Sequence, residues 1–129
     1  MAPTDLLAFG EPTHLEPAFA WTRNDLFAEL AGHGYRSIAL ETDRVAALVV
    51  DDYVRYGTGT LDIAMARGFS HGFGDFAANR GLVAWMREYI GGPGRADTFR
   101  IVAVRKVSVR RKRGGRGRPA PAQLACLAA

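Results

Sequence analysis

A strand–helix–strand pattern in the first third of the chain is the feature that most constrains its fold. A short apolar run at 6–9 has the length of a buried strand and ends at Gly10 and Pro12, residue types that break strands and shape turns. A helical pattern over 16–30 follows, and a second short apolar run occupies 35–41. Two strands joined through a helix form a right-handed parallel crossover. The pattern therefore predicts an α/β domain in which helices flank a parallel sheet.

Side chains suited to acid–base chemistry follow both predicted strands. Glu11 and His14 come just after the first strand, and Glu41 ends the second. Parallel strands end at the same edge of a sheet and ligands bind outside that edge, so we expect these three side chains to converge there. A polar turn whose histidine caps the next helix explains the first segment equally well, because short motifs of this kind recur by chance.

Arg23 lies on the apolar face of the predicted first helix, four residues after Phe19. A charged group on such a face is costly unless it is paired, and the planar guanidinium group suits a carboxylate. We therefore expect Arg23 to meet Glu11 or Glu41 near the strand ends. In the alternative interpretation, the arginine reaches solvent from the edge of the apolar stripe.

Apolar spacing predicts three further helices in the middle of the chain, separated by glycines, and a third strand at 98–104. We expect Thr42 or Asp43 to cap the first of these helices, and Asp75 or Asn79 to cap the last. The sheet would then have two or three strands with helices packed on them.

Two segments in this region carry residue types that occur in binding sites. The adjacent Asp51 and Asp52 lie within a predicted helix and are interpreted as a solvated face rather than as metal ligands. The loop at 68–74 is rich in glycine and aromatic residues but has no phosphate-loop pattern. Its His71 and Phe73 are candidates for binding an apolar substrate, and a loop histidine with no role is the alternative.

The charge of the chain changes abruptly near its last quarter. Residues 1–99 hold 8 basic and all 13 acidic residues, a net charge of −5, whereas residues 100–129 hold 9 basic residues and no acid. The second segment has too little apolar periodicity to fold alone, so we predict a disordered basic tail. Its composition is that of a GC-rich coding sequence read out of frame, and we interpret it as a frameshifted ending. A tail that binds nucleic acid through salt-sensitive contacts is the less favoured alternative.

The composition also indicates the cellular compartment in which the protein is expected. The single cysteine, Cys126, can form neither an internal disulfide nor a multi-thiolate metal site. The N-terminus has no basic segment followed by an apolar core, and no apolar run approaches ~18 residues. We therefore expect a soluble cytoplasmic protein with no membrane partner and no cofactor.

Five features combine into a pattern that is more specific than any one of them: Gly10–His14, Arg23 nine residues after the histidine, Ala39–Glu41, Val50–Val54 and Trp85–Tyr89. This combination resembles the N-terminal part of the erythromycin esterase family, over about residues 5–99. The resemblance implies a hydrolase that opens the lactone ring of a macrolide, a carboxylic ester, and thereby gives antibiotic resistance. Its partner would be a small-molecule ester.

The resemblance also implies roles for the candidate residues. His14 would act as the general base on a water molecule, Glu11 and Glu41 would orient it, and Arg23 would hold the carboxylates or the oxyanion. Histidine titrates near neutral pH and suits proton abstraction there, and a cation stabilises a developing oxyanion. A metal-dependent hydrolase is the alternative, because Glu11, His14 and Glu41 are also suitable ligands for a divalent metal.

Members of this family are considerably longer than 129 residues. We therefore expect an incomplete domain that lacks part of the sheet and of the site, with weak or no activity by itself. An incomplete sheet leaves a strand edge unpaired and apolar helix faces uncovered, which favours self-association.

Overall fold

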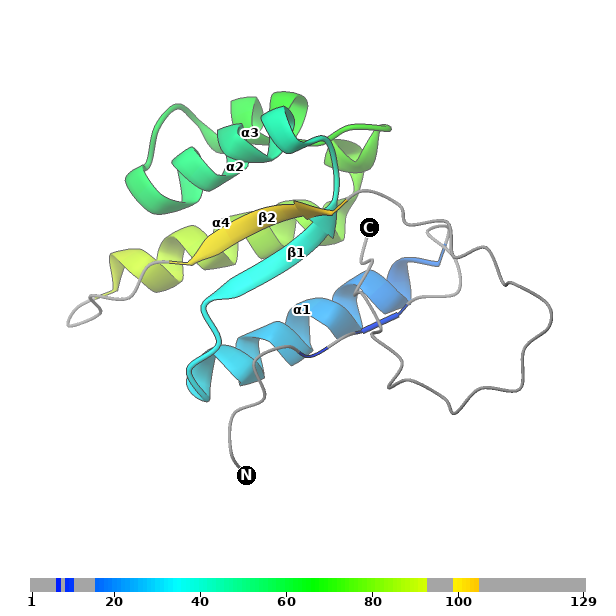
Figure 1. Cartoon of the computed structure of the whole chain (residues 1–129), viewed down its shortest axis with the longest axis vertical. Coiled ribbons are helices and arrows are strands. Elements are labelled where there is room, and N and C mark those ends of the chain that lie inside the picture. Colours follow the sequence, from blue (N-terminus) through cyan, green and yellow to red (C-terminus); the bar gives the residue numbers. More distant parts are fainter. Residues whose placement is uncertain (1–6, 8, 11–15, 93–98, 105–129) are drawn as a thin grey trace, which may run out of the picture.

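A computed structural model describes residues 7, 9, 10, 16–92 and 99–104. Its elements are, in chain order, α1 (Pro17–Gly32), β1 (Ser37–Glu41), α2 (Arg44–Tyr56), α3 (Leu61–Gly68), a 3-10 turn (Phe73–Asp75), α4 (Ala77–Gly91) and β2 (Arg100–Val104) (Figure 1). The predicted mixed α/β class with flanking helices is confirmed. The division at residues 99 and 100, the nature of the basic tail and self-association stay predictions.

The sheet of the described residues consists of β1 and β2, which run parallel with Ile38 opposite Ile101. The strand predicted at 98–104 is therefore present. Of the strand predicted at 6–9, the structure describes Leu7 and Phe9, and neither of them is in a strand. Residues 6 and 8 lie outside the described residues.

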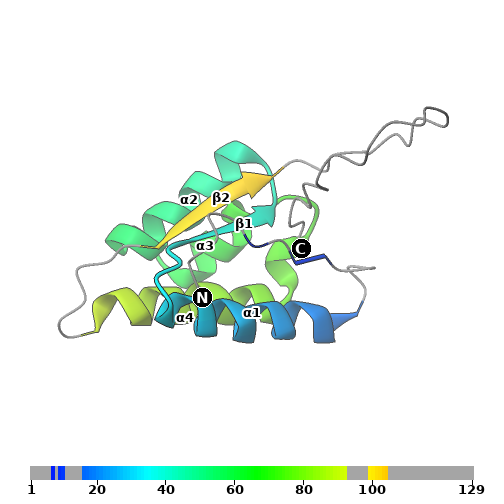
Figure 2. The same ribbon diagram turned by 60° about the horizontal axis from the view of Figure 1, so that its bottom comes forward.

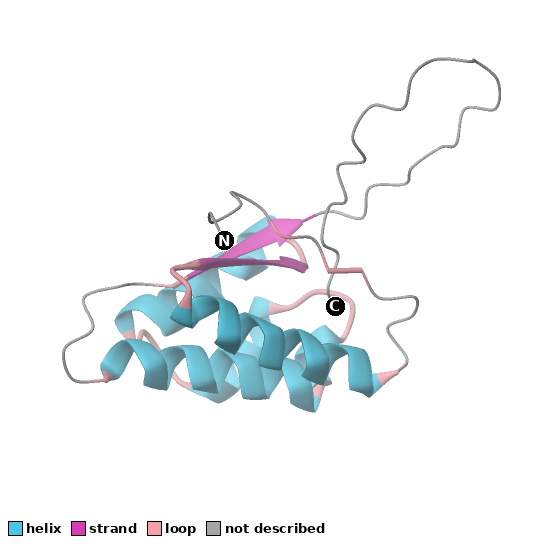
Figure 3. Ribbon diagram, turned by 90° about the horizontal axis from the view of Figure 1, so that it is seen from below, coloured by secondary structure: helices cyan, strands magenta, loops and turns pink. Residues whose placement is uncertain are grey.

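The helices lie behind the two strands and alongside them, and they leave the front of the sheet open in the view of Figure 1. In Figure 1, α4 runs behind the strands, α2 and α3 lie on the side of β2, and α1 lies on the side of β1. Figure 2 shows α1 alongside α4, and Figure 3 shows the strands on one side of a layer of helices. One face of the sheet is buried against this layer through Ile38, Leu40 and Ile101. Residues of the opposite face include Val102, which is exposed.

The helix boundaries follow from local capping. Glu16 precedes α1 and its carboxylate accepts a hydrogen bond from the amide of Ala18, while Pro17 occupies the first turn, where no amide is needed. Asp43 caps α2 as predicted, because its carboxylate accepts from the amides of Val45 and Ala46. The same helix ends at Gly57, whose φ of 70° is a left-handed conformation that glycine adopts without strain.

The cap predicted for α4 is wrong. Phe76 occupies that position and makes no side-chain capping bond. Asn79 lies one turn further on and is buried in the core. Asp75 belongs to the 3-10 turn that precedes Phe76.

Asp51 also differs from the sequence interpretation, because it is buried rather than solvated. Its Oδ1 accepts a hydrogen bond of 3.0 Å from the amide of Ile101. The preceding amide, that of Arg100, donates to Arg36 before β1, and successive amides of a strand point to opposite sides. Asp51 therefore satisfies an amide on the outer edge of β2, whereas its neighbour Asp52 is exposed as expected.

An aromatic cluster joins α1, α4 and the start of β2. The ring of Phe99 lies 5.3 Å from Phe27, 5.5 Å from Trp85 and 4.7 Å from Tyr89, measured between centroids. Contacts of this kind hold the beginning of β2 against both helices. In the part of the chain that the structure describes, no helix combines the length and apolarity needed to cross a membrane.

Candidate functional site

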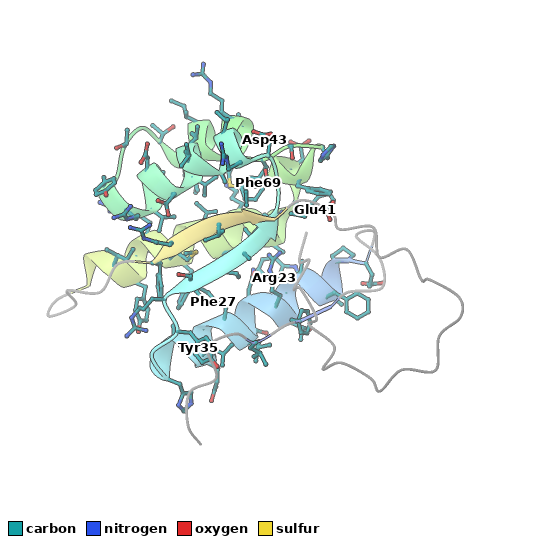
Figure 4. All side chains as sticks on the ribbon, viewed as in Figure 1. Arg23, Phe27, Tyr35, Glu41, Asp43 and Phe69 are labelled. Carbon is teal, nitrogen blue, oxygen red and sulfur yellow. The ribbon has the colours of Figure 1, made fainter. Side chains whose placement is uncertain are left out.

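Two of the four predicted catalytic residues are described, and both are buried. Glu41 ends β1 with 9% of its surface exposed, and Arg23 lies on α1 with 2% exposed. Figure 4 shows Arg23 on the side of α1 that faces the sheet, and Glu41 at the end of the strand. The other two, Glu11 and His14, lie outside the described residues, so their convergence with Glu41 stays a prediction.

Arg23 does not reach solvent, so the alternative interpretation of its position is wrong. Its Nε and Nη2 donate to Asn24 Oδ1 at 3.1 and 2.8 Å, and Nη2 also donates to Asn79 Oδ1 at 2.8 Å. The guanidinium group therefore has hydrogen bonds to two amide side chains. Amide oxygens fix the direction of the group and, being neutral, add no negative charge to it.

The two asparagines are themselves bonded to backbone carbonyls, one at the start of α4 and one in the 3-10 turn before it. Asn24 donates from Nδ2 to the carbonyl oxygen of Ala78 at 2.7 Å, and Asn79 donates to that of Phe73 at 2.9 Å. The orientation of Arg23 thus depends on backbone groups 50 or more residues away in the sequence. A shared network of buried polar groups holds α1 against α4 at this point.

Sequence reasoning missed Asn79 as a partner of Arg23, although a signal was present. Asn79 falls on the same helical stripe as Leu82, Val83 and Met86, all of which are buried. A polar residue on an apolar stripe is costly unless it is bonded, which is the argument that singled out Arg23. Arg23 on α1 and Asn79 on α4 are two such residues, and they are hydrogen-bonded to each other.

The loop after α3 is fixed to the strand end beside Glu41. Ser70 donates its backbone amide to Thr42 Oγ1 at 2.9 Å, and its Oγ accepts from the amide of Asp43 at 2.9 Å. Thr42 is buried. These bonds hold the predicted substrate-binding loop against the carboxyl end of β1, the side of a parallel sheet where ligands bind.

His71 occupies a central position of a tight turn, and Phe73 is the last residue of that turn. The amide of Phe73 donates to the carbonyl of Ser70 at 3.1 Å, and the two central residues, His71 and Gly72, have φ of 59° and 76°. Two positive φ values define a type I′ turn. The turn exposes His71, whereas Phe73 is buried, with the two rings 5.9 Å apart. Of the two candidates for binding substrate, His71 is the one that solvent reaches.

The described residues contain no group of three or more histidine, cysteine or acidic side chains arranged to hold a metal ion. The metal-dependent alternative needs Glu11 and His14 in addition to Glu41, and these two lie outside the described residues. That alternative therefore remains a prediction from the sequence.

Comparison with protein-family models identifies the family of this chain. The family model described as erythromycin esterase matches residues 30–101, more than half of the chain. The chain belongs to the erythromycin esterase family. The matched residues include Glu41 and the turn with His71, while Arg23 precedes them. We found no match among curated proteins and none among solved structures. Family membership supports a hydrolase.

Proposed function

We propose that this member of the erythromycin esterase family hydrolyses a carboxylic ester, with the lactone ring of a macrolide as its substrate. In this proposal His14 takes a proton from a water molecule, and Glu11 and Glu41 orient the imidazole and the water. Arg23 holds the carboxylates or the oxyanion that develops on the carbonyl oxygen. Opening the ring adds one water molecule and would inactivate the antibiotic.

The burial and fixed direction of Arg23 carry the proposal. With 2% of its surface exposed, the guanidinium group is withdrawn from water. An interaction with a developing negative charge is stronger there than at a surface. The hydrogen bonds that the guanidinium group donates to Asn24 and Asn79 set its direction before any substrate arrives, so little reorganisation is needed when charge develops.

The positions of Glu41 and His71 support the same site. Glu41 stands at the carboxyl end of β1, where an open parallel sheet binds its ligands. The loop bonded to the adjacent Thr42 and Asp43 presents His71 to solvent near that end. A substrate that approaches this edge would meet the imidazole of His71 on its way to Glu41.

The direct test incubates the purified chain with a macrolide and follows the gain of one water by mass spectrometry. Because the domain is expected to be incomplete, we expect only weak hydrolysis by the wild type, and a loss of about 100-fold or more from that level in His14→Ala, the usual contribution of a general base. The matched control is His33→Ala, because the His33 side chain is 71% exposed at the end of α1 and is expected to leave the rate unchanged.

Arg23→Lys tests the role of the guanidinium group. Lysine keeps the charge but lacks the planar fork that meets two acceptors. We therefore expect kcat of Arg23→Lys to be about 100-fold lower than that of the wild type. Hydrolysis that persists in His14→Ala would refute the general-base role. A folded wild-type chain that hydrolyses neither a macrolide nor a panel of simple esters would refute the proposed function.

A further inference from the structure

The side chain of Asn79 is a polar group in an apolar part of the core. It is 1% exposed and lies on the face of α4 that also buries Leu82, Val83 and Met86. An apolar residue of similar size would fill this position without losing hydrogen bonds to water. The amide is accommodated because both of its ends are bonded to protein groups.

These two bonds lead in different directions. Oδ1 accepts from Nη2 of Arg23 on α1 at 2.8 Å, and Nδ2 donates to the carbonyl oxygen of Phe73 at 2.9 Å. Phe73 is the last residue of the type I′ turn that exposes His71. One buried side chain thus connects the proposed oxyanion-stabilising cation with the proposed substrate-binding turn.

We propose that Asn79 is a positioning residue that sets the direction of Arg23 relative to the turn at 70–73. This inference rests on the proposed function for its role in hydrolysis. Asn79 does not touch the reacting atoms; it acts through Arg23, whose Nη2 it shares with Asn24. Without Asn79 the guanidinium group keeps Asn24, which is bonded to the carbonyl of Ala78 on α4, but it loses its connection to the turn that ends at Phe73.

Aspartate and alanine separate the two bonds of Asn79. Asn79→Asp keeps an acceptor for Nη2 of Arg23 but places a second acceptor against the carbonyl of Phe73. Asn79→Ala removes both bonds. We therefore expect the Arg23 side chain to stay ordered in Asn79→Asp and to become mobile in Asn79→Ala.

The first measurement needs no substrate. Hydrogen exchange of the Arg23 Nη2–H groups, which donate to Asn79, is followed by NMR in arginine-labelled protein, with the signals assigned by their disappearance in Arg23→Lys. Because a hydrogen bond to a charged group changes a local opening equilibrium by roughly tenfold or more, we expect exchange to accelerate about tenfold in Asn79→Ala. Asn79→Asp is expected to keep the slow wild-type exchange.

Val83→Ala is the matched control, because Val83 lies four residues further along α4 and is fully buried. It opens a cavity in the same helix face without touching Arg23. We expect it to lower stability while leaving the exchange of Arg23 unchanged. Unchanged exchange in Asn79→Ala, or equal acceleration in Val83→Ala, would overturn the inference, since Asn79 would then be only a core residue.

Kinetics supply the second measurement. In the macrolide assay we expect Asn79→Ala to lower kcat about tenfold or more while KM changes less than about twofold, since the direction of Arg23 acts mainly in the transition state. Asn79→Asp holds Arg23 in place but puts a negative charge beside it, so its kcat is expected to stay below that of the wild type, and equal kcat in Asn79→Ala and wild type would overturn the role in hydrolysis. A wild type that hydrolyses nothing would count against the proposed function alone, because the exchange measurement decides on Asn79 independently.

Discussion

Replacing Asp51 with alanine tests the finding that a side chain of α2 closes the outer edge of β2. The carboxylate accepts from the buried amide of Ile101 at 3.0 Å and lies 3.4 Å from Nη1 of Arg55. In Asp51→Ala the amide of Ile101 keeps its position in the core but loses its acceptor. A buried donor without an acceptor retains the full cost of having left water.

The magnitude follows from these two contacts. An unsatisfied buried amide costs about 1–3 kcal/mol, and an ion pair four residues apart on a helix is worth about 0.3–0.5 kcal/mol. Alanine returns roughly 0.5 kcal/mol through its higher helix propensity than aspartate. We therefore expect Asp51→Ala to lower the free energy of unfolding by about 2 kcal/mol, a large part of the roughly 5–15 kcal/mol typical of a whole domain.

Urea unfolding followed by tryptophan fluorescence measures this loss. With a slope of about 1 kcal/mol per molar urea for a small domain, the midpoint is expected to fall by about 2 M. Asp51→Asn keeps an oxygen that can accept from Ile101 and is expected to lose less than about 1 kcal/mol. Asp52→Ala is the matched control, since this neighbour is exposed, and should stay within about 0.5 kcal/mol of wild type. A loss in Asp51→Ala no larger than in Asp52→Ala would refute the edge-closing role.

Three further substitutions test the packing and the helix ends. Gly68→Ala would bring a Cβ into overlap with the buried side chain of Val50, so thermal denaturation should show a loss of about 1–3 kcal/mol, and an unchanged midpoint would contradict this packing. Gly57→Ala forces a side chain into a φ of 70° and toward the guanidinium of Arg87, and about 1–2 kcal/mol should be lost; equal stability would mean that the helix ends differently. Asp43→Ala should cost about 1 kcal/mol through the lost cap while Asp43→Asn should not, and equal losses in both would argue against capping.

Local patterns predicted most of the elements, because each depends on a few neighbouring residues. The apolar spacing, the proline of the first turn and the flanking glycines were sufficient to place α1 and α3 to within a residue or two. The capping role of Asp43 followed from the same kind of reasoning, whereas the parallel pair of β1 and β2 joins strands from distant parts of the chain. Residues whose role depends on a distant segment were harder to predict.

Asp51 shows why. Two adjacent acids on a helix are usually both solvated, although Asp51, unlike Asp52, falls on the buried stripe of α2 with Ala47, Val50 and Val54. The difference arises 50 residues later, where the amide of Ile101 on the outer edge of β2 needs an acceptor. A strand at the edge of the described sheet has such unpaired amides at every second residue, but which helix meets them is a property of the tertiary fold.

Arg23 shows how far the same argument extends when it is applied to pairs. A charge on an apolar stripe demands a partner, and a carboxylate was the expected one; the structure adds two amides, from Asn24 beside it and from Asn79 on α4. Amides suit a group that must act on charge arriving later, because they set its direction without adding negative charge to it.

Had stability alone shaped the contact between Arg23 and Asn79, a pair of apolar side chains would have served as well, since replacing both partners of a buried polar pair is often neutral or stabilising. The double variant Arg23→Met with Asn79→Leu is therefore expected to unfold at a urea concentration no lower than that of either single variant, while hydrolysis is lost in both variants without Arg23 and falls about tenfold in Asn79→Leu. A double variant that is less stable than both singles would show that the polar pair contributes to the fold itself.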